Sequence, residues 1–300
     1  MKKLIAVMLA GAVTAAMVTG CGGGNTDTPA DAPAETETPA EDAPAETEAG
    51  EDTEAAPEDA QAASGESDLA YVQDKGTLVV GITDFEPMDY KSEDGSWIGF
   101  DADMAGAFAE SLGVSVEFVE IDWDNKILEL DGKTIDCVWN GMTLTDEVKS
   151  SMECSNAYCN NAQIVIVPAD QADQYQDVDS LSDLNFAVEA GSAGEEQVDA
   201  LGLAFTPVKA QSDALMEVAA GTSDAAVIDS LMAAAMVGEG TGYADLTYTV
   251  QLNSEEYGVG FRKGSDLAAA LNDFFKTAYG DGTMQQIADL DPAMVASVAD

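Results

Sequence analysis

The chain has 300 residues and a formal net charge of −46 at pH 7, and it contains no histidine. The negative charge disfavours nucleic acid as a partner, since it repels phosphate backbones, and the lack of histidine excludes Ser-His-Asp catalysis and imidazole metal sites. Four cysteines without CxxC spacing do not indicate a zinc site or a disulfide scaffold, so we expect no metal and no other cofactor.

The first 21 residues are typical of an export signal. Two lysines precede an apolar stretch that is too short for a membrane-spanning helix, which needs about 20 residues. The stretch ends in Val18-Thr19-Gly20-Cys21, which resembles the lipobox of bacterial lipoproteins. We expect residues 1–21 to be a lipoprotein signal peptide and Cys21 to carry a lipid that anchors the protein to the outer face of a Gram-positive-like cell membrane. An ordinary signal peptide with a chance cysteine is the alternative.

Residues 22–67 are acidic and rich in Pro, Ala and Thr, and they contain no Lys or Arg. The sequence Ala-Pro-Ala-Glu-Thr-Glu occurs twice, at 32–37 and 43–48. Like charges repel, proline opposes helix formation, and almost nothing large and apolar is present to be buried. We expect a disordered tether that holds the folded part away from the membrane.

From residue 75 the chain alternates short apolar strands with amphipathic helices. Asp94-Gly95 between two apolar segments indicates a hairpin, and Gly113 ends a helix whose apolar residues share one face. This alternation is typical of an α/β protein with mostly parallel sheets. The predicted strands are 77–82, 115–121, 135–139, 163–167, 185–188, 204–207, 225–228 and 257–261. The predicted helices are 104–112, 212–221 and 230–237, with two more that begin at 192 and after 265.

Polar and aromatic residues stand at the ends of several predicted strands. In such sheets a ligand binds in the crevice outside the carboxyl ends of the strands. The residues at these ends describe a pocket with two aromatic faces, hydroxyl groups and one carboxylate, which suits binding rather than catalysis. They are Phe85, Trp123, Thr143, Ser192 and Asp229.

Several short motifs follow one another in a fixed order along residues 76–290. Residues 99–103 read Gly-Phe-Asp-Ala-Asp, and residues 141–145 read Gly-Met-Thr-Leu-Thr. Further segments of the same series are 75–81, 122–124, 190–192 and 257–264. In this order they resemble the motifs of the extracytoplasmic solute-binding proteins of polar amino acid ABC transporters, including GFDVD and GMTxT.

The resemblance implies a periplasmic-binding-protein-like (type II) α/β fold with two lobes that close on a ligand around two crossover hinge segments. The implied parts are a solute-binding domain at 68–300, lobe 1 at 68–159 and 258–300, lobe 2 at 160–257, and crossovers near 158–163 and 253–258.

The resemblance also implies a function. The chain would be a monomeric, non-enzymatic protein that captures an amino acid or related small amine outside the cell and delivers it to the permease of an ABC importer. One alternative is a dehydratase on the same scaffold, with Asp229, Glu189 or Glu86 as the proton-transfer group. A module that reports ligand to a sensor is another alternative.

By position, Phe85 and Trp123 match the family's aromatic pair around the ligand side chain, with core packing as the alternative. Asp229 matches the carboxylate that pairs with the ligand ammonium, and Thr143 matches a hydroxyl that faces the ligand; either residue is otherwise a helix N-cap. The other implied contacts are the carbonyl segment Asn140 and Gly141, and the N–H groups of Ser192 and Ala193 at a helix start, which hold an anionic group.

One position departs from the family pattern. Val148 stands where the resemblance places a carboxylate-binding arginine, and the adjacent Lys149 points elsewhere if this segment is helical. The only arginine, Arg262, lies in the closing motif, and lysine does not reproduce the bidentate geometry of arginine. With Glu189 nearby, we expect the ionic groups of the pocket to be negative and acidic amino acids to bind worst. The identity of the ligand stays open.

Two cysteines, Cys154 and Cys159, lie five residues apart beside the first expected crossover. A disulfide is possible outside the cytoplasm. Two free thiols packed as small apolar residues is the favoured interpretation.

Overall fold

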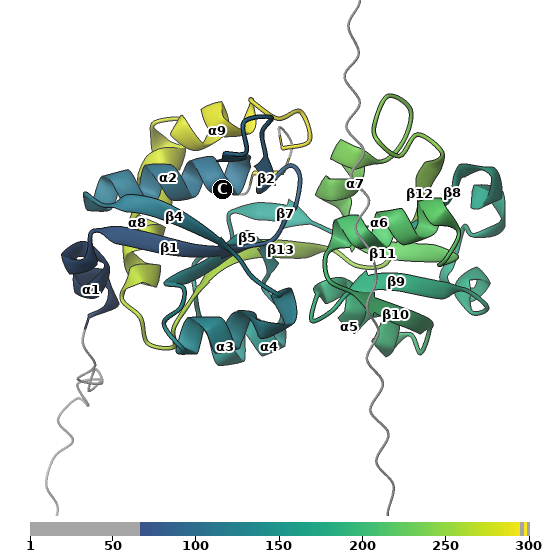
Figure 1. Cartoon of the computed structure of the whole chain (residues 1–300), viewed down its shortest axis with the longest axis horizontal. Coiled ribbons are helices and arrows are strands. Elements are labelled where there is room, and N and C mark those ends of the chain that lie inside the picture. Colours follow the sequence, from purple (N-terminus) through teal and green to yellow (C-terminus); the bar gives the residue numbers. More distant parts are fainter. Residues whose placement is uncertain (1–66, 295–296, 299–300) are drawn as a thin grey trace, which may run out of the picture. The chain divides into compact units, whose positions relative to one another are not determined.

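The computed structural model describes residues 67–294 and 297–298, which build two main sheets with helices on both faces (Figure 1). The predicted signal peptide, Cys21 and the predicted tether up to residue 66 lie outside the described residues. A small antiparallel hairpin of β2 (Tyr90–Lys91) and β3 (Trp97–Ile98) confirms the turn predicted at Asp94-Gly95.

The first sheet has six strands, and one of them comes from far along the chain. The strands are β1 (Thr77–Ile82), β4 (Ser115–Glu120), β5 (Cys137–Thr143), β6 (Glu153–Cys154), β7 (Cys159–Asn161) and β13 (Glu255–Phe261). Their order is β4-β1-β5-β13-β6, and β7 also pairs with β13. The β1 strand is parallel to β4 and β5, whereas β13 is antiparallel to each of its partners.

Helices cover both faces of the first sheet because its central strand is apolar on both sides (Figure 1). The ring of Trp139 on β5 packs against Phe108 and Phe275 on one face. The next residue toward the N-terminus, Val138, belongs to a second cluster with Leu130 on the other face. The helices are α1 (Asp68–Lys75), α2 (Phe100–Leu112), η1 (Trp123–Asn125), α3 (Lys126–Asp131), α4 (Asp146–Ser151), α8 (Leu267–Gly280) and α9 (Thr283–Ala288).

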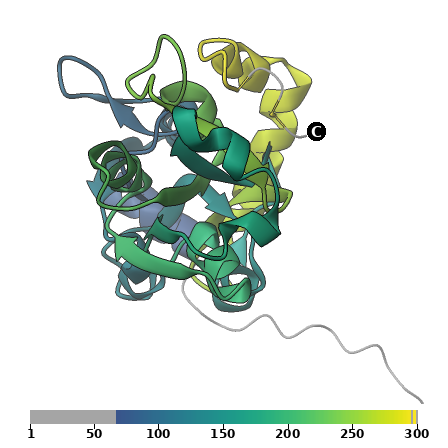
Figure 2. The same cartoon turned by 90° about the vertical axis from the view of Figure 1, so that its right-hand side faces the viewer.

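The second sheet has five strands in the order β10-β9-β11-β8-β12, flanked by helices (Figure 2). They are β8 (Gln163–Pro168), β9 (Asn185–Glu189), β10 (Ala204–Val208), β11 (Ala225–Asp229) and β12 (Leu246–Gln251). The helices are α5 (Ala193–Ala200), α6 (Gln211–Ala220) and α7 (Ser230–Met236), with short 3-10 turns η2 (Ala169–Gln174) and η3 (Val178–Leu181). Strands β9, β10 and β11 are parallel, and β8 and β12 are antiparallel to their neighbours.

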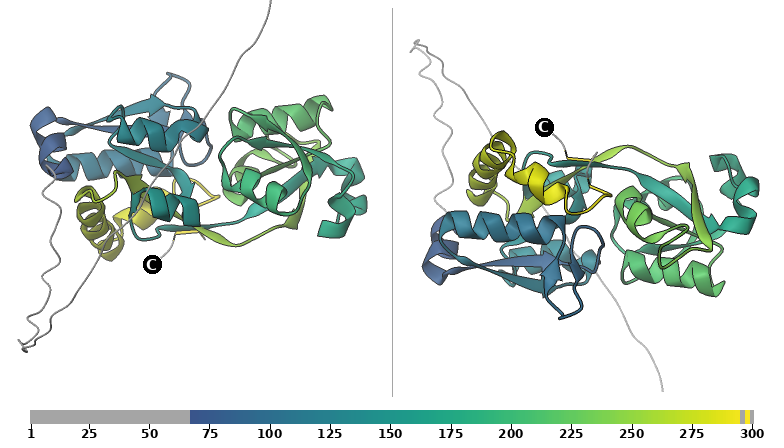
Figure 3. Two further views of the ribbon diagram at one scale, coloured as in Figure 1. Left: turned by 90° about the horizontal axis from the view of Figure 1, so that it is seen from below. Right: turned by 90° about the horizontal axis from the view of Figure 1, so that it is seen from above.

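The chain passes between the two sheets twice, and the two passages lie side by side (Figure 3). The β7 strand leads through Ala162 into β8, and β12 leads through residues 252–254 into β13. Asn161 pairs with Glu255 in the sheet, and the Leu252 N–H donates to the Gln163 carbonyl over 2.8 Å. The two-lobe α/β fold with two crossovers is confirmed. The predicted lobe bounds fall within β7 and β13 and stay a prediction.

Three element-level expectations differ from the structure. Both sheets are mixed rather than mostly parallel, because strands that return through the crossovers run antiparallel to the rest. The strand predicted at 135–139 occupies Cys137–Thr143. The prediction ended too early because polar Asn140 interrupts the apolar run on which it relied. The β12 strand was not predicted because it is an edge strand whose side chains, such as exposed Tyr248, do not form an apolar run.

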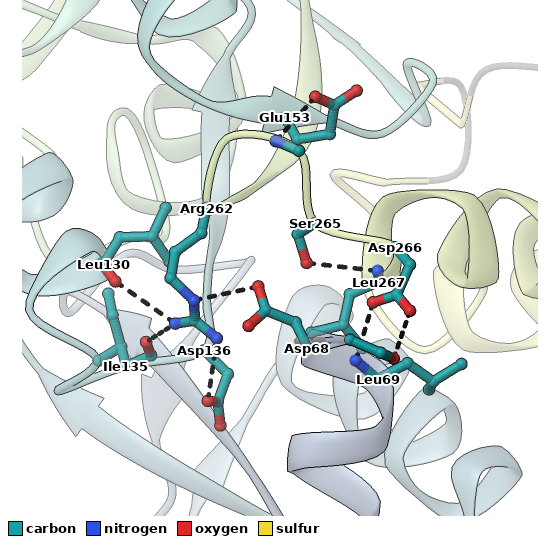
Figure 4. Close-up of polar contacts among 12 residues, drawn as sticks. Asp68, Leu69, Leu130, Ile135, Asp136, Glu153, Arg262, Ser265, Asp266 and Leu267 are labelled. Atoms are coloured by element: carbon teal, nitrogen blue, oxygen red, sulfur yellow. Dashed lines mark hydrogen bonds and ion pairs between the residues drawn. The ribbon is translucent and has the colours of Figure 1, made fainter. Parts of the chain in front are cut away.

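The only arginine of the chain holds the first lobe together. The Arg262 side chain is buried, its Nε lies 3.1 Å from Asp68 Oδ2, and its Nη1 donates to the Ile135 carbonyl over 2.9 Å (Figure 4). Asp136 completes the cluster by pairing with Arg262 and with Lys75. Arg262 is therefore a structural residue, as its place in the closing motif indicated.

No helix in the described part of the chain is long and apolar enough to cross a membrane. In the same residues, no group of His, Cys, Asp or Glu side chains has the arrangement of a metal site. Cys137, Cys154 and Cys159 are free thiols, which confirms the favoured interpretation of the last two.

Candidate functional site

A cavity lies between the two lobes, at the carboxyl ends of β5 and β11. Residues of both lobes line it, and every ligand contact that the sequence predicts is among them. Those residues are Phe85, Trp123, Asn140, Gly141 and Thr143 from the first lobe, and Ser192, Ala193 and Asp229 from the second.

The two predicted aromatic residues border the cavity and also pack into the core. Phe85 is 3% exposed and meets the ring of Tyr257 edge-on, with centroids 6.4 Å apart. Trp123 is 7% exposed and belongs to the same apolar cluster as Leu130. The two interpretations of these residues are therefore compatible, since each ring has one side in the core and reaches the cavity.

The side chain of Asn140 is fully used inside the first lobe. Its Oδ1 accepts from the N–H and the hydroxyl of Thr83, and its Nδ2 donates to the Thr83 carbonyl and to Asp89. An amide has two donor hydrogens and one acceptor oxygen with two lone pairs, so these four bonds satisfy it. Only the backbone of Asn140 is left to face a ligand.

Gly141 follows with a left-handed backbone, φ +56°, directly beneath Phe85. A Cβ at this position would lie 2.5 Å from Phe85 Cε1, so only glycine lets the strand approach the ring. The Gly141 N–H donates to Asp101 Oδ2 over 2.6 Å, and the Tyr158 hydroxyl donates to the same oxygen. Asp101, from the 99–103 motif, thus fixes the backbone below the aromatic ring. Burial raises the pKa of Asp101 to about 7.

Thr143 is the last residue of β5 and is not a helix cap. Its hydroxyl donates to Glu255 Oε1 over 2.9 Å. The N-cap of α4 is Thr145, whose hydroxyl oxygen accepts from the Val148 N–H. The N-cap interpretation of Thr143 was therefore wrong, and Val148 is a buried apolar residue of the cavity wall.

Asp229 stands at the N-cap position of α7, but its side chain makes no capping bond. Its carboxylate instead accepts from the side-chain amides of Asn161, Gln163 and Gln211. Glu255 accepts from the Asn161 and Gln163 amides as well, so the two carboxylates share donors. Burial, followed by the negative charge of Glu255, raises the pKa of Asp229 to about 8.

Ser192 is the N-cap of α5, with its hydroxyl oxygen accepting from the Glu195 N–H over 3.1 Å. The Ser192 N–H donates to the Glu189 carbonyl. The Glu195 carboxylate accepts a hydrogen bond from the Gly191 N–H, and this bond fixes the turn that leads into the helix. Of the predicted anion-holding loop, Ala193 lines the cavity at the first turn of the helix.

Sequence reasoning missed the cation of the cavity. Lys126, the first residue of α3, lines the cavity and is 7% exposed. The expectation that all ionic groups of the pocket are negative was therefore wrong. The spacing carried a signal, since Lys126 lies one helical turn after Trp123, and residues three apart on a helix share a face. Lys149, the lysine next to Val148, borders a separate groove with Asn160.

Carboxylates outnumber this cation. Glu189 is 3% exposed, and its Oε1 has no hydrogen-bond partner among the described residues. Burial, followed by the charge of Asp229, raises the pKa of Glu189 to about 8. Glu147 on α4 and Glu196 on α5 also line the cavity, and the charge of Glu147 adds to burial in raising the pKa of Glu196. Besides Asp229, the cavity wall therefore carries three acidic side chains, Glu147 from the first lobe and Glu189 and Glu196 from the second, and these attract a cation.

Comparison with known proteins identifies the family. Residues 78–289 match the model of the bacterial extracellular solute-binding proteins, family 3. The chain belongs to this family. It is 29% identical to the L-cystine-binding protein TcyJ of Escherichia coli over 230 residues, which is 74% of this chain and 84% of that protein. It is 28% identical to the arginine-binding extracellular protein ArtP of Bacillus subtilis over 241 residues, 75% and 89% of the two chains.

Solved structures give the same family context. The Gly52Ala mutant of arginine-bound ArgBP from T. maritima has a TM-score of 0.66 and 31% identity, covering 70% of this chain and 99% of that one. Cyclohexadienyl dehydratase of Pseudomonas aeruginosa is 28% identical over 117 residues, which is 39% of this chain. The relatives that match most of the chain are thus binding proteins, and the match to an enzyme is partial.

Proposed function

We propose that the chain captures an amino acid with a positively charged side chain outside the cell and hands it to the permease of an ABC importer. The observation that carries the choice of ligand is the unpartnered, buried carboxylate oxygen of Glu189 in the wall of the cavity between the lobes. Burial keeps Glu189 mostly protonated near pH 7, and a cation of the ligand beside this oxygen favours the ionised carboxylate and forms a charge-assisted hydrogen bond with it.

The remaining walls fit the same ligand. Phe85 lines the cavity, and the face of an aromatic ring attracts a cation that lies against it. Asp229 is positioned to receive the α-ammonium, with its carboxylate fixed by amides. Glu147 and Glu196 approach from opposite lobes, and their mutual repulsion is relieved by a positive side chain between them. The names of ArtP and ArgBP, which state that those relatives bind arginine, favour the same class.

Catalysis is not part of the proposal. A proton-transfer group must be free to reach the substrate, whereas the carboxylate of Asp229 is held by three amides. Glu86, another candidate for a dehydratase, does not line the cavity, so Glu189, which does, is the group that the enzyme alternative would use. Mass spectrometry of an amino acid recovered after long incubation with the protein should show unchanged mass, and a dehydrated product would favour the enzyme alternative.

We also propose that the protein acts as a monomer and is anchored to the membrane by a lipid on Cys21, with residues 22–67 as a tether. The support is the lipobox-like sequence before Cys21 and the acidic, proline-rich composition after it. In cells fed a fatty-acid analogue, we expect label on the wild type and none on Cys21→Ser, because the thiol is the acceptor. Cys154→Ser is the control and should keep the label. Undiminished label on Cys21→Ser would contradict the anchor.

Titration calorimetry with L-arginine, L-glutamine and L-glutamate tests the proposed ligand class. L-Arginine should bind most tightly, and L-glutamate at least about a hundredfold more weakly, since a second carboxylate meets Glu189, Glu147 and Glu196. If L-glutamate binds more tightly than L-arginine, the charge assignment of the cavity is wrong. If none of the three binds, the proposed amino acid function fails.

Asp229→Asn should weaken binding of L-arginine by about 30- to 5,000-fold while leaving the fold intact, because it removes one partner of a buried charge pair worth about 2–5 kcal/mol.

The affinity of the wild type for L-arginine should rise from about pH 6 to about pH 8. The raised pKa of Asp229 leaves its carboxyl group protonated at the lower pH, and the ligand ammonium pairs with the ionised form. The variant should lose much of this pH dependence. Asp199→Asn, at an exposed position on α5, is the control. Binding by Asp229→Asn within a few-fold of wild type would exclude the ammonium role.

A further inference from the structure

Lys126 is a buried lysine that joins the two lobes across the cavity. Its Nζ donates to the carbonyl of Gly191 over 2.8 Å, and to the carbonyl of Trp123 over 3.3 Å. The same ammonium lies over the Trp123 ring, 5.0 Å from its centroid. Gly191 belongs to the second lobe, so the head of Lys126 reaches from one wall of the cavity to the other.

Among the described residues, no carboxylate lies within ion-pair distance of the Lys126 ammonium. Burial lowers the pKa of Lys126, and the surrounding charges of Glu189, Glu147 and Glu196 oppose this effect and favour the ammonium form. The two hydrogen bonds of the ammonium go to neutral carbonyls. An ammonium has three donor hydrogens, so one donor is left for another acceptor. Of the described residues that line the cavity, Lys126 alone carries a positive charge.

The surroundings of Lys126 suit a carboxylate. Its head lies beside Gly191, immediately before Ser192, the N-cap of α5. Backbone N–H groups and the dipole at a helix start favour negative charge. A Cβ on Gly191, whose φ is +70°, would lie 2.9 Å from Asp124 Cα, so glycine allows the second-lobe turn to come this close to the lysine. Val148 on α4, which lines the cavity from the same lobe as Lys126, offers no donor side chain.

From this arrangement we propose that Lys126 binds the α-carboxylate of the amino acid ligand and thereby sets the specificity for amino acids over amines without a carboxylate. The inference rests on the proposed amino acid function. The ligand would lie with its carboxylate at Lys126 and the α5 start, and with its ammonium at Asp229. Lys126 supplies from α3 the cation that α4 lacks at Val148.

Matched pairs of ligands separate this role from that of a simple bond between lobes. L-Arginine and L-argininamide differ at the carboxylate alone, and L-histidine with L-histidinamide gives a second pair. In the wild type, each acid should bind about 10- to 150-fold more tightly than its amide, as expected for one charge-assisted bond. Lys126→Met should weaken the acids by about that factor and change binding of the amides by less than about threefold.

Two further variants sharpen the test. Lys149→Met removes a nearby lysine that does not line the cavity and should leave both members of each pair unchanged. Val148→Arg in the Lys126→Met background places a cation in the cavity wall of the same lobe and should recover at least about tenfold of the lost affinity for the acids. Circular dichroism checks that each variant is folded.

The outcomes are distinct. Equal losses for acid and amide in Lys126→Met would make Lys126 a link between the lobes and overturn the inference, while the proposed function would stand. Equal wild-type affinity for an acid and its amide would overturn the inference even if Lys126→Met did not fold. If the wild type binds neither L-arginine, L-histidine nor L-glutamine, the proposed function fails, and this inference fails with it.

Discussion

Two carboxylates, those of buried Asp229 and half-buried Glu255, accept hydrogen bonds from the same two amides, Asn161 and Gln163. The amides flank the first crossover and Glu255 lies at the second, so this network ties both crossovers to the floor of the cavity. Burial, followed by the negative charge of Glu255, raises the pKa of Asp229 to about 8. In the proposed function, a ligand ammonium would pair with Asp229 and favour its ionised form, so ligand binding would act on the network that joins the two crossovers.

The cavity is built so that each lobe contributes charge. The first lobe supplies Lys126 and the aromatic rings, and the second supplies Asp229 and Glu189. A zwitterion with a positive side chain pairs with both signs only when the lobes are together, as they are where Lys126 contacts Gly191. Family 3 membership explains the scaffold, and the proposed choice of ligand rests on these particular charges.

The sequence predicted the fold class, the crossovers and the residues that meet in the cavity, because glycine-rich motifs and strand ends mark them. It did not predict Lys126, since one lysine in an acidic chain looks like a solvated residue until α3 places it against Trp123 and Gly191. Nor did it show that every hydrogen-bonding group of the Asn140 side chain is bonded to Thr83 or Asp89. Such bonds depend on long-range contacts that periodicity does not encode.

The central claim is that the lobes close over an amino acid, and a distance across the mouth of the cavity tests it most directly. Glu120 and Lys209 line, from opposite lobes, a groove that also includes Thr83 of the cavity wall. Each of these two positions is changed to cysteine and spin-labelled, and Cys21 and Cys154 are replaced by serine. Pulsed electron paramagnetic resonance then measures the distance between the two labels. The account predicts a shorter and narrower distance distribution with saturating L-arginine than without it. An unchanged distribution at saturation would contradict closure.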